Sequence, residues 1–256
     1  MPKILVVDSD SPEKNAEYVA AGEPRTGEQY ASVLKRIRAD VLTTVIEPYE
    51  GDNIPDLSAF DGVVFTGSGV AWNTDDPRAE PLAAVMRATF KAGRPTIGSC
   101  NGMQLAASVL GGTTGESPKG REDGIAKGIH LTKAGKGHPM MAGREDGFSV
   151  PCIHRDEVLQ MPEGAVLLAS NDHSQVQAFA YEQDGIDFWG MQYHPELSCE
   201  TVANGMERWG RSTPEYLDHL RIAAEDTNAA AYVGTTPEEQ AFETRTLELR
   251  NWLARF

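Results

Sequence analysis

The chain has 256 residues, of which 40% are hydrophobic and 24% charged, and its formal net charge is -15 at pH 7. This charge argues against a general nucleic-acid-binding protein, which needs clustered Lys and Arg to neutralise phosphates. No run approaches the roughly 18 apolar residues of a membrane span, and the N-terminus lacks the apolar core of a signal peptide, so we expect a cytoplasmic protein that does not bind a membrane.

The first half of the chain alternates apolar strands with amphipathic helices. Strands are predicted at 3–8, 41–47 and 62–66, and a further short strand leads into Cys100. Helices are predicted at 29–39 and 77–92, whereas 9–28 is expected to be a loop with at most a helical turn at 13–20. This alternation predicts a doubly wound α/β sheet, which places ligands at the carboxyl ends of its strands.

The second half has a different pattern, with short alternating runs separated by turns. Five antiparallel strands are predicted, at 125–132, 147–153, 165–170, 175–181 and 185–192. The segment after Glu196 is expected to be helical, with helix starts at Thr213-Pro214 and at Thr236-Pro237 and a capping box at the second. An apolar stripe must pack either on the main domain or on a partner chain; it comprises Phe242, Leu249, Trp252, Leu253 and Phe256.

Cys100 has the surroundings of a nucleophile. It lies between a strand and a helix, and Gly98 and Gly102 allow the two backbones to pass closely while Cys100 adopts a strained turn. The positive end of the helix dipole favours a thiolate, and free N–H groups there can hold an oxyanion. Because most cysteines are inert core residues, this turn alone leaves catalysis and simple packing both open.

The triplet His194-Pro195-Glu196 supplies what a thiol nucleophile needs. A base must remove the thiol proton and later protonate the leaving amine, and that base needs an acceptor to orient it. Proline keeps the residue before it extended, so the side chains of His194 and Glu196 can fall on the same side. We therefore predict a Cys100–His194–Glu196 catalytic triad.

These residues resemble a known family. The motif Gly98-x-Cys100-x-Gly102-x-Gln104, followed downstream by Gln192-Tyr-His-Pro-Glu196, is similar to the glutaminase domain of the class I (triad) glutamine amidotransferases. The resemblance covers roughly 3–208 and is strongest to the GMP synthetases and their stand-alone relatives. It implies a flavodoxin-like, mostly parallel sheet in a glutaminase domain at 1–208. A helical extension at 209–256 would pack on that domain or on a partner.

The resemblance also implies roles for individual residues. Cys100 would attack the side-chain amide of glutamine to give a γ-glutamyl thioester and ammonia, with His194 as general acid and base and Glu196 as its partner. The oxyanion hole would comprise backbone N–H groups of Gly67, Ser68 and Asn101. The substrate would contact Gln104, Ser149, Val150 and Pro151. We expect no cofactor, and the three cysteines and six histidines show no spacing typical of a metal site.

Two positions depart from the family pattern. Gly67-Ser68-Gly69 stands where two glycines and a proline are usual, which places the resting oxyanion hole in question. Asn101 replaces an aliphatic residue, which matters little if only its backbone is used. We also expect no synthase domain in the 60 residues after Glu196 (256 minus 196), because they lack a phosphate-cradling glycine loop.

Several functions remain open at this level. The chain could be the glutaminase subunit of an amidotransferase that passes ammonia to a separate synthase, or a stand-alone hydrolase of γ-glutamyl amides or peptides. A different class of protein would be an idle regulatory subunit, held inactive by the Ser68 loop until a partner reorganises it. An unrelated α/β cysteine protein would also have its cysteine on a sharp turn between a strand and a helix. That alternative does not account for the His-Pro-Glu triplet.

Overall fold

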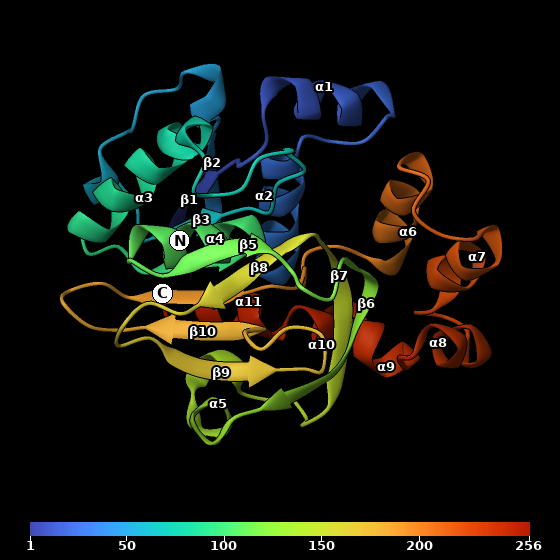
Figure 1. Ribbon diagram of the computed structural model, residues 1–256. Helices are drawn as coiled ribbons and strands as arrows, with labels where there is room; N and C mark the ends of the chain where they lie inside the picture. The colour runs from blue at the N-terminus through green and yellow to red at the C-terminus, as the bar shows by residue number, and fades with distance from the viewer.

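A nine-stranded mixed sheet forms the centre of the computed structural model, which describes residues 1–256 (Figure 1). Across the sheet the strands are β2 (Leu42–Ile46), β1 (Lys3–Val7), β3 (Gly62–Phe65), β4 (Thr96–Ser99), β11 (Phe188–Met191), β10 (Ala178–Tyr181), β9 (Val166–Ser170), β6 (Glu122–Leu131) and β7 (Phe148–His154). The first five are mutually parallel and the remaining pairs are antiparallel. The predicted α/β fold, with antiparallel strands in the second half, is confirmed.

Strand β11 joins the two halves of the sheet. It was predicted as one of the antiparallel strands, and it does pair antiparallel with β10, but its other neighbour, β4, is parallel to it. The ends of β4 and β11 therefore lie side by side at the same edge, with Met191 opposite Ser99. Since Cys100 follows β4 and His194 follows β11, this pairing brings the two predicted catalytic segments together.

Helices cover both faces of the parallel half of the sheet. Along β1, Ile4 and Val6 point to one face and Leu5 and Val7 to the other, as the two-residue repeat of a strand requires. Helices α2 (Thr26–Ile37) and α11 (Leu247–Leu253) pack on the first face, and α3 (Glu80–Lys91) and α4 (Asn101–Val109) pack on the second. Both faces are thus buried, which explains why these strands are continuously apolar.

The helical extension packs on this same chain. After α6 (Cys199–Arg208), the helices α7 (Pro214–Ile222) and α8 (Thr227–Val233) form a separate apolar cluster with it, and α9 (Pro237–Gln240), α10 (Phe242–Arg245) and α11 then return to the sheet (Figure 1). Leu249, Trp252 and Leu253 of the predicted stripe are buried in the same core as β1 and β3. The predicted Thr213 cap and the Thr236 capping box are both present. The domain boundary at residue 208 stays a prediction.

Some elements differ from the expectation. The segment expected to be a loop contains the nine-residue helix α1 (Pro12–Ala20), because the side chain of Ser11 caps its N-terminus. A small sheet of β5 (Thr113–Glu116) and β8 (Asp156–Gln160) and the short helix α5 (Lys133–Gly137) were not predicted, since each is too short for a clear repeat. Short 3₁₀ helices occur at Pro48–Glu50, Leu57–Ala59, Pro77–Ala79 and Pro139–Met141.

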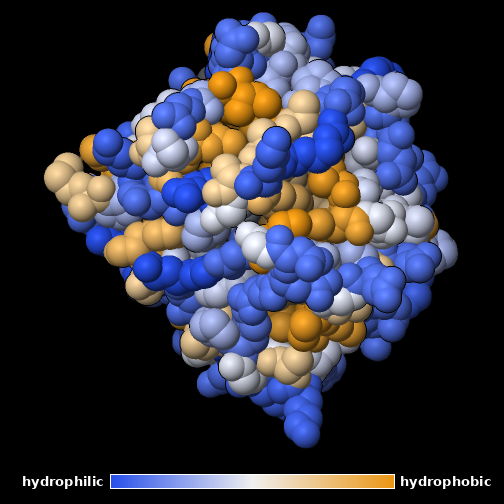
Figure 2. All heavy atoms as spheres, turned by 90° about the vertical axis from the view of Figure 1, so that its left-hand side faces the viewer, coloured by the Kyte–Doolittle hydropathy of each residue, from blue (hydrophilic) through white to orange (hydrophobic).

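The surface is largely hydrophilic (Figure 2), as expected for a chain in which 24% of the residues are charged. On the face shown in Figure 2, hydrophilic side chains surround several separate apolar patches. Among the helices, none combines the length and the apolar composition that crossing a membrane would require.

Candidate active site

Cys100 occupies a strained turn between β4 and α4. Its backbone angles are φ 47° and ψ -105°, a combination that L-residues rarely adopt. A Cβ on Gly98 would lie 2.6 Å from the backbone carbon of Gly102, and one on Gly102 would lie 2.5 Å from the carbonyl oxygen of Phe65. The predicted strained backbone and the need for both glycines are confirmed, and the turn holds the 5% exposed Cys100 at the edge of the sheet.

His194 and Glu196 form a short, buried pair. The Nδ1 of His194 lies 2.7 Å from Oε1 of Glu196, and both residues are 5% exposed. The other carboxylate oxygen of Glu196 accepts a hydrogen bond of 3.3 Å from the hydroxyl of Ser99, which in turn lies 2.8 Å from the hydroxyl of Tyr30. Glu196 is therefore held from two sides and can fix the orientation of the imidazole.

The free nitrogen of His194 is available to Cys100. Nε2 makes no hydrogen bond within the chain, and both side chains line the same cavity. Burial lowers the pKa of His194, but the negative charges of Glu196 and of the Cys100 thiolate outweigh it and raise that pKa to about 10. An imidazolium is therefore favoured at neutral pH, and it stabilises a neighbouring thiolate.

Residues with free backbone N–H groups line the same cavity as Cys100. The N–H groups of Gly67 and Ser68, after β3, and that of Asn101, the first residue of α4, donate to no acceptor within the chain. The loop packs tightly on the imidazole, since a Cβ on Gly67 would lie 2.4 Å from Cε1 of His194. The residues that carry the N–H groups, the thiol and the imidazole all line one cavity, and such a set of groups can attack a carbonyl and hold the resulting oxyanion.

Asp10 holds the loop that carries Ser68. Its Oδ1 accepts hydrogen bonds from the backbone N–H of Gly69 at 2.6 Å and from the Ser68 hydroxyl at 3.0 Å, while its Oδ2 accepts from the Thr26 hydroxyl at 2.6 Å. Asp10 is 1% exposed, and burial raises its pKa to about 6. The serine that departs from the family pattern thus has a partner that fixes the loop.

No role was predicted for Asp10 from the sequence, in which the first predicted strand ends with another acidic residue, Asp8. The sequence signal that could have identified Asp10 is its position two residues after the end of this strand, at the edge of the sheet where ligands bind. Because β1 and β3 are neighbours in the sheet, the segments after them meet at one edge, which places Asp10 beside Gly69.

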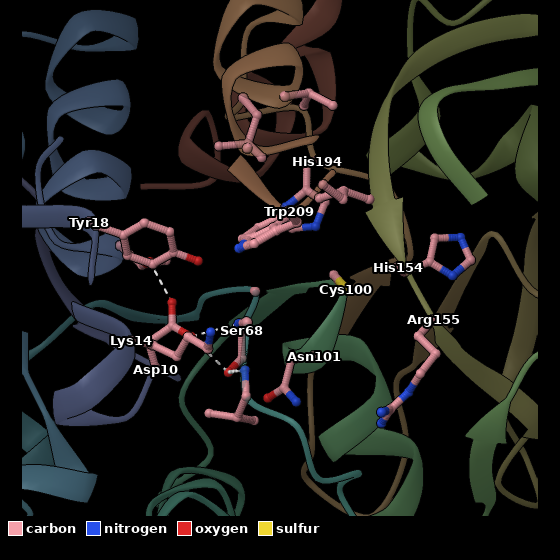
Figure 3. Close-up of a pocket in the computed structure, with 18 of the residues that line it drawn as sticks. Asp10, Lys14, Tyr18, Ser68, Cys100, Asn101, His154, Arg155, His194 and Trp209 are labelled. Atoms are coloured by element: carbon pink, nitrogen blue, oxygen red, sulfur yellow. Dashed lines mark hydrogen bonds between the residues drawn. The ribbon is translucent and has the colours of Figure 1, made fainter. Parts of the chain in front are cut away.

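The cavity has a volume of about 360 Å³ and extends beyond the immediate surroundings of Cys100 (Figure 3). Asp10, Lys14 and Tyr18 line one side of it and His154 and Arg155 the other. One face of α6 lines it from Thr201 to Arg208, and this ten-residue helix is about 15 Å long. Beyond that helix its lining continues with Trp209 and Arg211.

Gln104, predicted to contact the substrate, does line the cavity. Its amide nitrogen donates to the carbonyl of Asp156 at 2.6 Å and to the side-chain oxygen of Gln192 at 3.2 Å, so part of its hydrogen-bonding capacity is already used by the protein. The side chain of Asn101 also lines the cavity, and its Oδ1 is buried without a hydrogen-bond donor. Asn101 therefore adds an unpaired side-chain acceptor to the residues that line the cavity.

Ser149, Val150 and Pro151 are not among the residues that line the cavity, and their contact with substrate stays a prediction. They lie within β7, where Ser149 bonds to the helical extension and the Pro151 carbonyl accepts the backbone N–H of His194 at 2.8 Å. The wall is formed by the next residues, 153–156, where β7 ends and the chain turns into β8. The physical reason is that only the end of β7 reaches the edge of the sheet at which Cys100 lies.

Gly67→Ala is expected to lower kcat by about 100-fold or more, because its methyl group would displace either the imidazole or the loop whose N–H groups are predicted to hold the oxyanion. Gly137→Ala is the matched control, since a Cβ there meets nothing within 4 Å. Steady-state kinetics with circular dichroism would check both proteins. Wild-type kcat in a folded Gly67→Ala protein would contradict the close approach of this loop to His194.

Comparison with known proteins agrees with the geometry. The sequence model of the family "Glutamine amidotransferase class-I" matches residues 28–208. A γ-glutamyl-L-1-hydroxyisopropylamide hydrolase of Pseudomonas sp. is 31% identical over 273 residues, which cover 98% of this chain and 92% of that protein. A glutamine-hydrolysing GMP synthase of Paraburkholderia phymatum is 32% identical over 187 residues, or 68% of this chain, and the chain spans only 32% of that protein's length.

Solved structures show the same fold. A glutamine amidotransferase from Methylobacillus flagellatus superposes with a TM-score of 0.67 at 20% sequence identity. The match covers 99% of this chain and 93% of that one, so the helical extension lies within the region compared.

Proposed function

The chain belongs to the class I glutamine amidotransferase family, and from this premise we propose that it is a cysteine hydrolase that cleaves γ-glutamyl amides through a thioester on Cys100. The observation that carries the proposal is the single cavity lined by Cys100, His194, Ser68 and Asn101, in which Nε2 of His194 and the N–H groups of Ser68 and Asn101 have no partner within the chain. Thiol, base and oxyanion donors are the three components that acyl transfer needs.

In the acylation step, the Cys100 thiolate attacks the γ-carbonyl carbon, and the carbonyl electron pair moves onto oxygen. The resulting oxyanion is held by the N–H of Asn101 and by N–H groups of Gly67 and Ser68. As it collapses, the C–N bond breaks, and the imidazolium of His194 gives its proton to the leaving amine. Glu196 stabilises the imidazolium throughout and keeps Nε2 directed at the reacting atoms.

In the deacylation step, neutral His194 removes a proton from a water molecule, which attacks the thioester carbonyl. A second oxyanion forms in the same place and collapses, breaking the C–S bond. Glutamate leaves, and the Cys100 thiolate and the His194 imidazolium are restored. Neither the acylation step nor the deacylation step requires an oxidant, a reductant or a cofactor.

The cavity supports a leaving amine larger than ammonia. Its volume of about 360 Å³ falls within the roughly 300–1,000 Å³ of pockets that enclose whole small molecules. It extends along α6 to Trp209, with Tyr18 on the opposite helix α1, so apolar surface is available beyond the γ-glutamyl unit. The Pseudomonas relative, named for a γ-glutamyl hydroxyalkylamide, supports the same substrate class here.

The test is glutamate release by the pure chain from three substrates: glutamine, a γ-glutamyl alkylamide and a γ-glutamyl dipeptide. We expect kcat/KM for the alkylamide to exceed that for glutamine by at least about tenfold, because the larger amine uses binding surface that ammonia leaves empty. An α-glutamyl amide, which places the scissile bond elsewhere, is the negative control. Absence of turnover with every γ-glutamyl substrate would refute the proposal.

The similarity to GMP synthases favours a second candidate, the glutaminase subunit of an amidotransferase that passes ammonia to a synthase. This function predicts the opposite preference, with glutamine as the best substrate and turnover that rises when the synthase is added. For either function we propose a cytoplasmic location, which the three free, buried cysteines support, because thiols persist in a reducing compartment.

A further inference from the structure

The segment that carries His194 is tied to the helical extension on both sides of the histidine. The hydroxyl of Tyr193 donates to Oε1 of Glu248 at 2.7 Å, and Nε of Arg245 donates to the carbonyl oxygen of Pro195 at 3.1 Å. Tyr193 and Glu248 are fully buried and Arg245 is 7% exposed. The residues immediately before and after His194 therefore each have a directional bond to a residue about 50 positions later in the chain.

A buried ion pair fixes the position of that extension. Arg144 donates to both carboxylate oxygens of Glu248 at 2.7 Å and to the carbonyl oxygen of Arg245 at 2.7 Å. The Arg144 and Glu248 side chains are 1% and 0% exposed. Breaking such a pair would leave an uncompensated buried charge, so the helices cannot slide along the sheet without a large cost. Apolar packing of Leu249 and Trp252 holds the extension against the sheet, and the ion pair fixes its orientation.

A second connection runs through β7. Glu239 accepts hydrogen bonds from the backbone N–H of Ser149 at 3.0 Å and from its hydroxyl at 2.6 Å, and the amide of Gln240 donates to the Ser149 carbonyl at 3.2 Å. Two residues later, the carbonyl of Pro151 accepts the backbone N–H of His194. The segment that sequence reasoning assigned to the substrate thus binds the extension on one side and the catalytic segment on the other.

We propose that helices α9–α11 do within this chain what a partner subunit would otherwise do: they hold His194 and Glu196 in the reactive position, so that Cys100 is active without a second protein. Arg245 and Glu248 are positioning residues in this arrangement, because they act on His194 through its neighbours. The inference rests on the proposed function for its choice of substrate. The inference adds that the enzyme is active without a synthase.

The test uses the full chain and two variants that remove one bond each. Tyr193→Phe removes only the hydroxyl that reaches Glu248, and Arg245→Met removes the donor to Pro195 while keeping a long side chain. Arg250→Gln, on the same helix as Glu248 but with a side chain that is 30% exposed, is the matched control. Arg245→Lys restores a charged donor and serves as the conservative rescue.

Two rates are measured: kcat for a γ-glutamyl alkylamide and the rate at which a small thiol reagent alkylates Cys100. We expect the wild-type chain to be active alone. Tyr193→Phe and Arg245→Met should lower both rates by about 10- to 100-fold with little change in KM, and Arg245→Lys should recover most of the loss. Arg250→Gln should match the wild type. Circular dichroism and thermal melting identify the folded fraction of each variant.

The outcomes separate the two proposals. Folded variants with wild-type kcat and alkylation rate would overturn the inference and leave the hydrolase function intact. A wild-type chain that alkylates rapidly at Cys100 but hydrolyses no γ-glutamyl substrate would refute the function, and slower alkylation in the variants would still support the inference. An inert Cys100 in the isolated chain would overturn the inference. Should Arg245→Met fail to fold, Tyr193→Phe decides, because it removes a single oxygen atom.

Discussion

Cys100→Ala abolishes glutamate release from every γ-glutamyl substrate, which is the largest effect expected for this protein. No other thiol can substitute, because Cys152 and Cys199 are buried, and burial raises the pKa of Cys152 far above its usual range and that of Cys199 to about 11. The oxyanion donors and His194 remain in the variant but have no nucleophile to assist. The measurement is glutamate release over hours at high enzyme concentration.

A trapping experiment gives this prediction a second readout. Mass spectrometry after rapid acid quench should find a γ-glutamyl adduct on wild-type Cys100 and none on the Cys100→Ala protein, while a γ-glutamyl alkylating analogue should label the wild type once. Substrate turnover by a folded Cys100→Ala protein, or labelling of Cys152 instead, would contradict covalent catalysis at Cys100. Circular dichroism of the variant is the control, since alanine fills most of the same small space.

His194→Asn is expected to lower kcat by about 10⁴-fold or more, because it removes both the partner of the thiolate and the proton donor to the leaving amine. Glu196→Gln should cost about 100-fold less, since it orients and stabilises the imidazole without exchanging a proton with the substrate. His130→Asn, at an exposed histidine, is the matched control and should have no effect. Equal losses in the two triad variants would contradict this division of roles.

The pH dependence of the same variants provides an independent measurement. The proton that His194 gives to the leaving amine is present in the free enzyme below the pKa of about 10, so wild-type kcat/KM, which reports the free enzyme, should hold through pH 9 and fall above pH 10. Of the two negative charges that raise this pKa, the charge of Glu196 has the larger effect. In Glu196→Gln the pKa falls, and the decline in rate should therefore begin at a lower pH. An unchanged alkaline limb would contradict the coupling between Glu196 and His194.

Local features of the active site could be predicted from short stretches of sequence. The spacing of Gly98, Cys100 and Gly102 specifies a turn through steric limits within five residues, and His194-Pro195-Glu196 places base and acceptor two residues apart. The structure has the strained Cys100 backbone and the 2.7 Å bond between His194 and Glu196. The helix caps at Thr213 and Thr236 belong to the same class, because a cap is a bond between residues three apart.

The surroundings of the site depend on which strands become neighbours. Asp10 reaches the Ser68 loop only because β1 and β3 pair in parallel, which brings together residues 58 positions apart. Ser149–Pro151 misses the cavity because β7 reaches the sheet edge only at its end, and a motif match does not specify where along a strand that occurs. A shift of a few residues along a strand therefore decides whether a side chain reaches the cavity.

The sequence by itself determined the parallel α/β plan, the strained turn at Cys100 and the pairing of His194 with Glu196, because each follows from contacts within a few residues or from a repeat along one element. Only the tertiary structure decided that β11 lies beside β4, that Asp10 holds the loop that carries Ser68, and that Arg245 and Glu248 hold the segment around His194. These contacts join residues about 50 to 100 positions apart, and such pairs form only where packing and strand register bring them together.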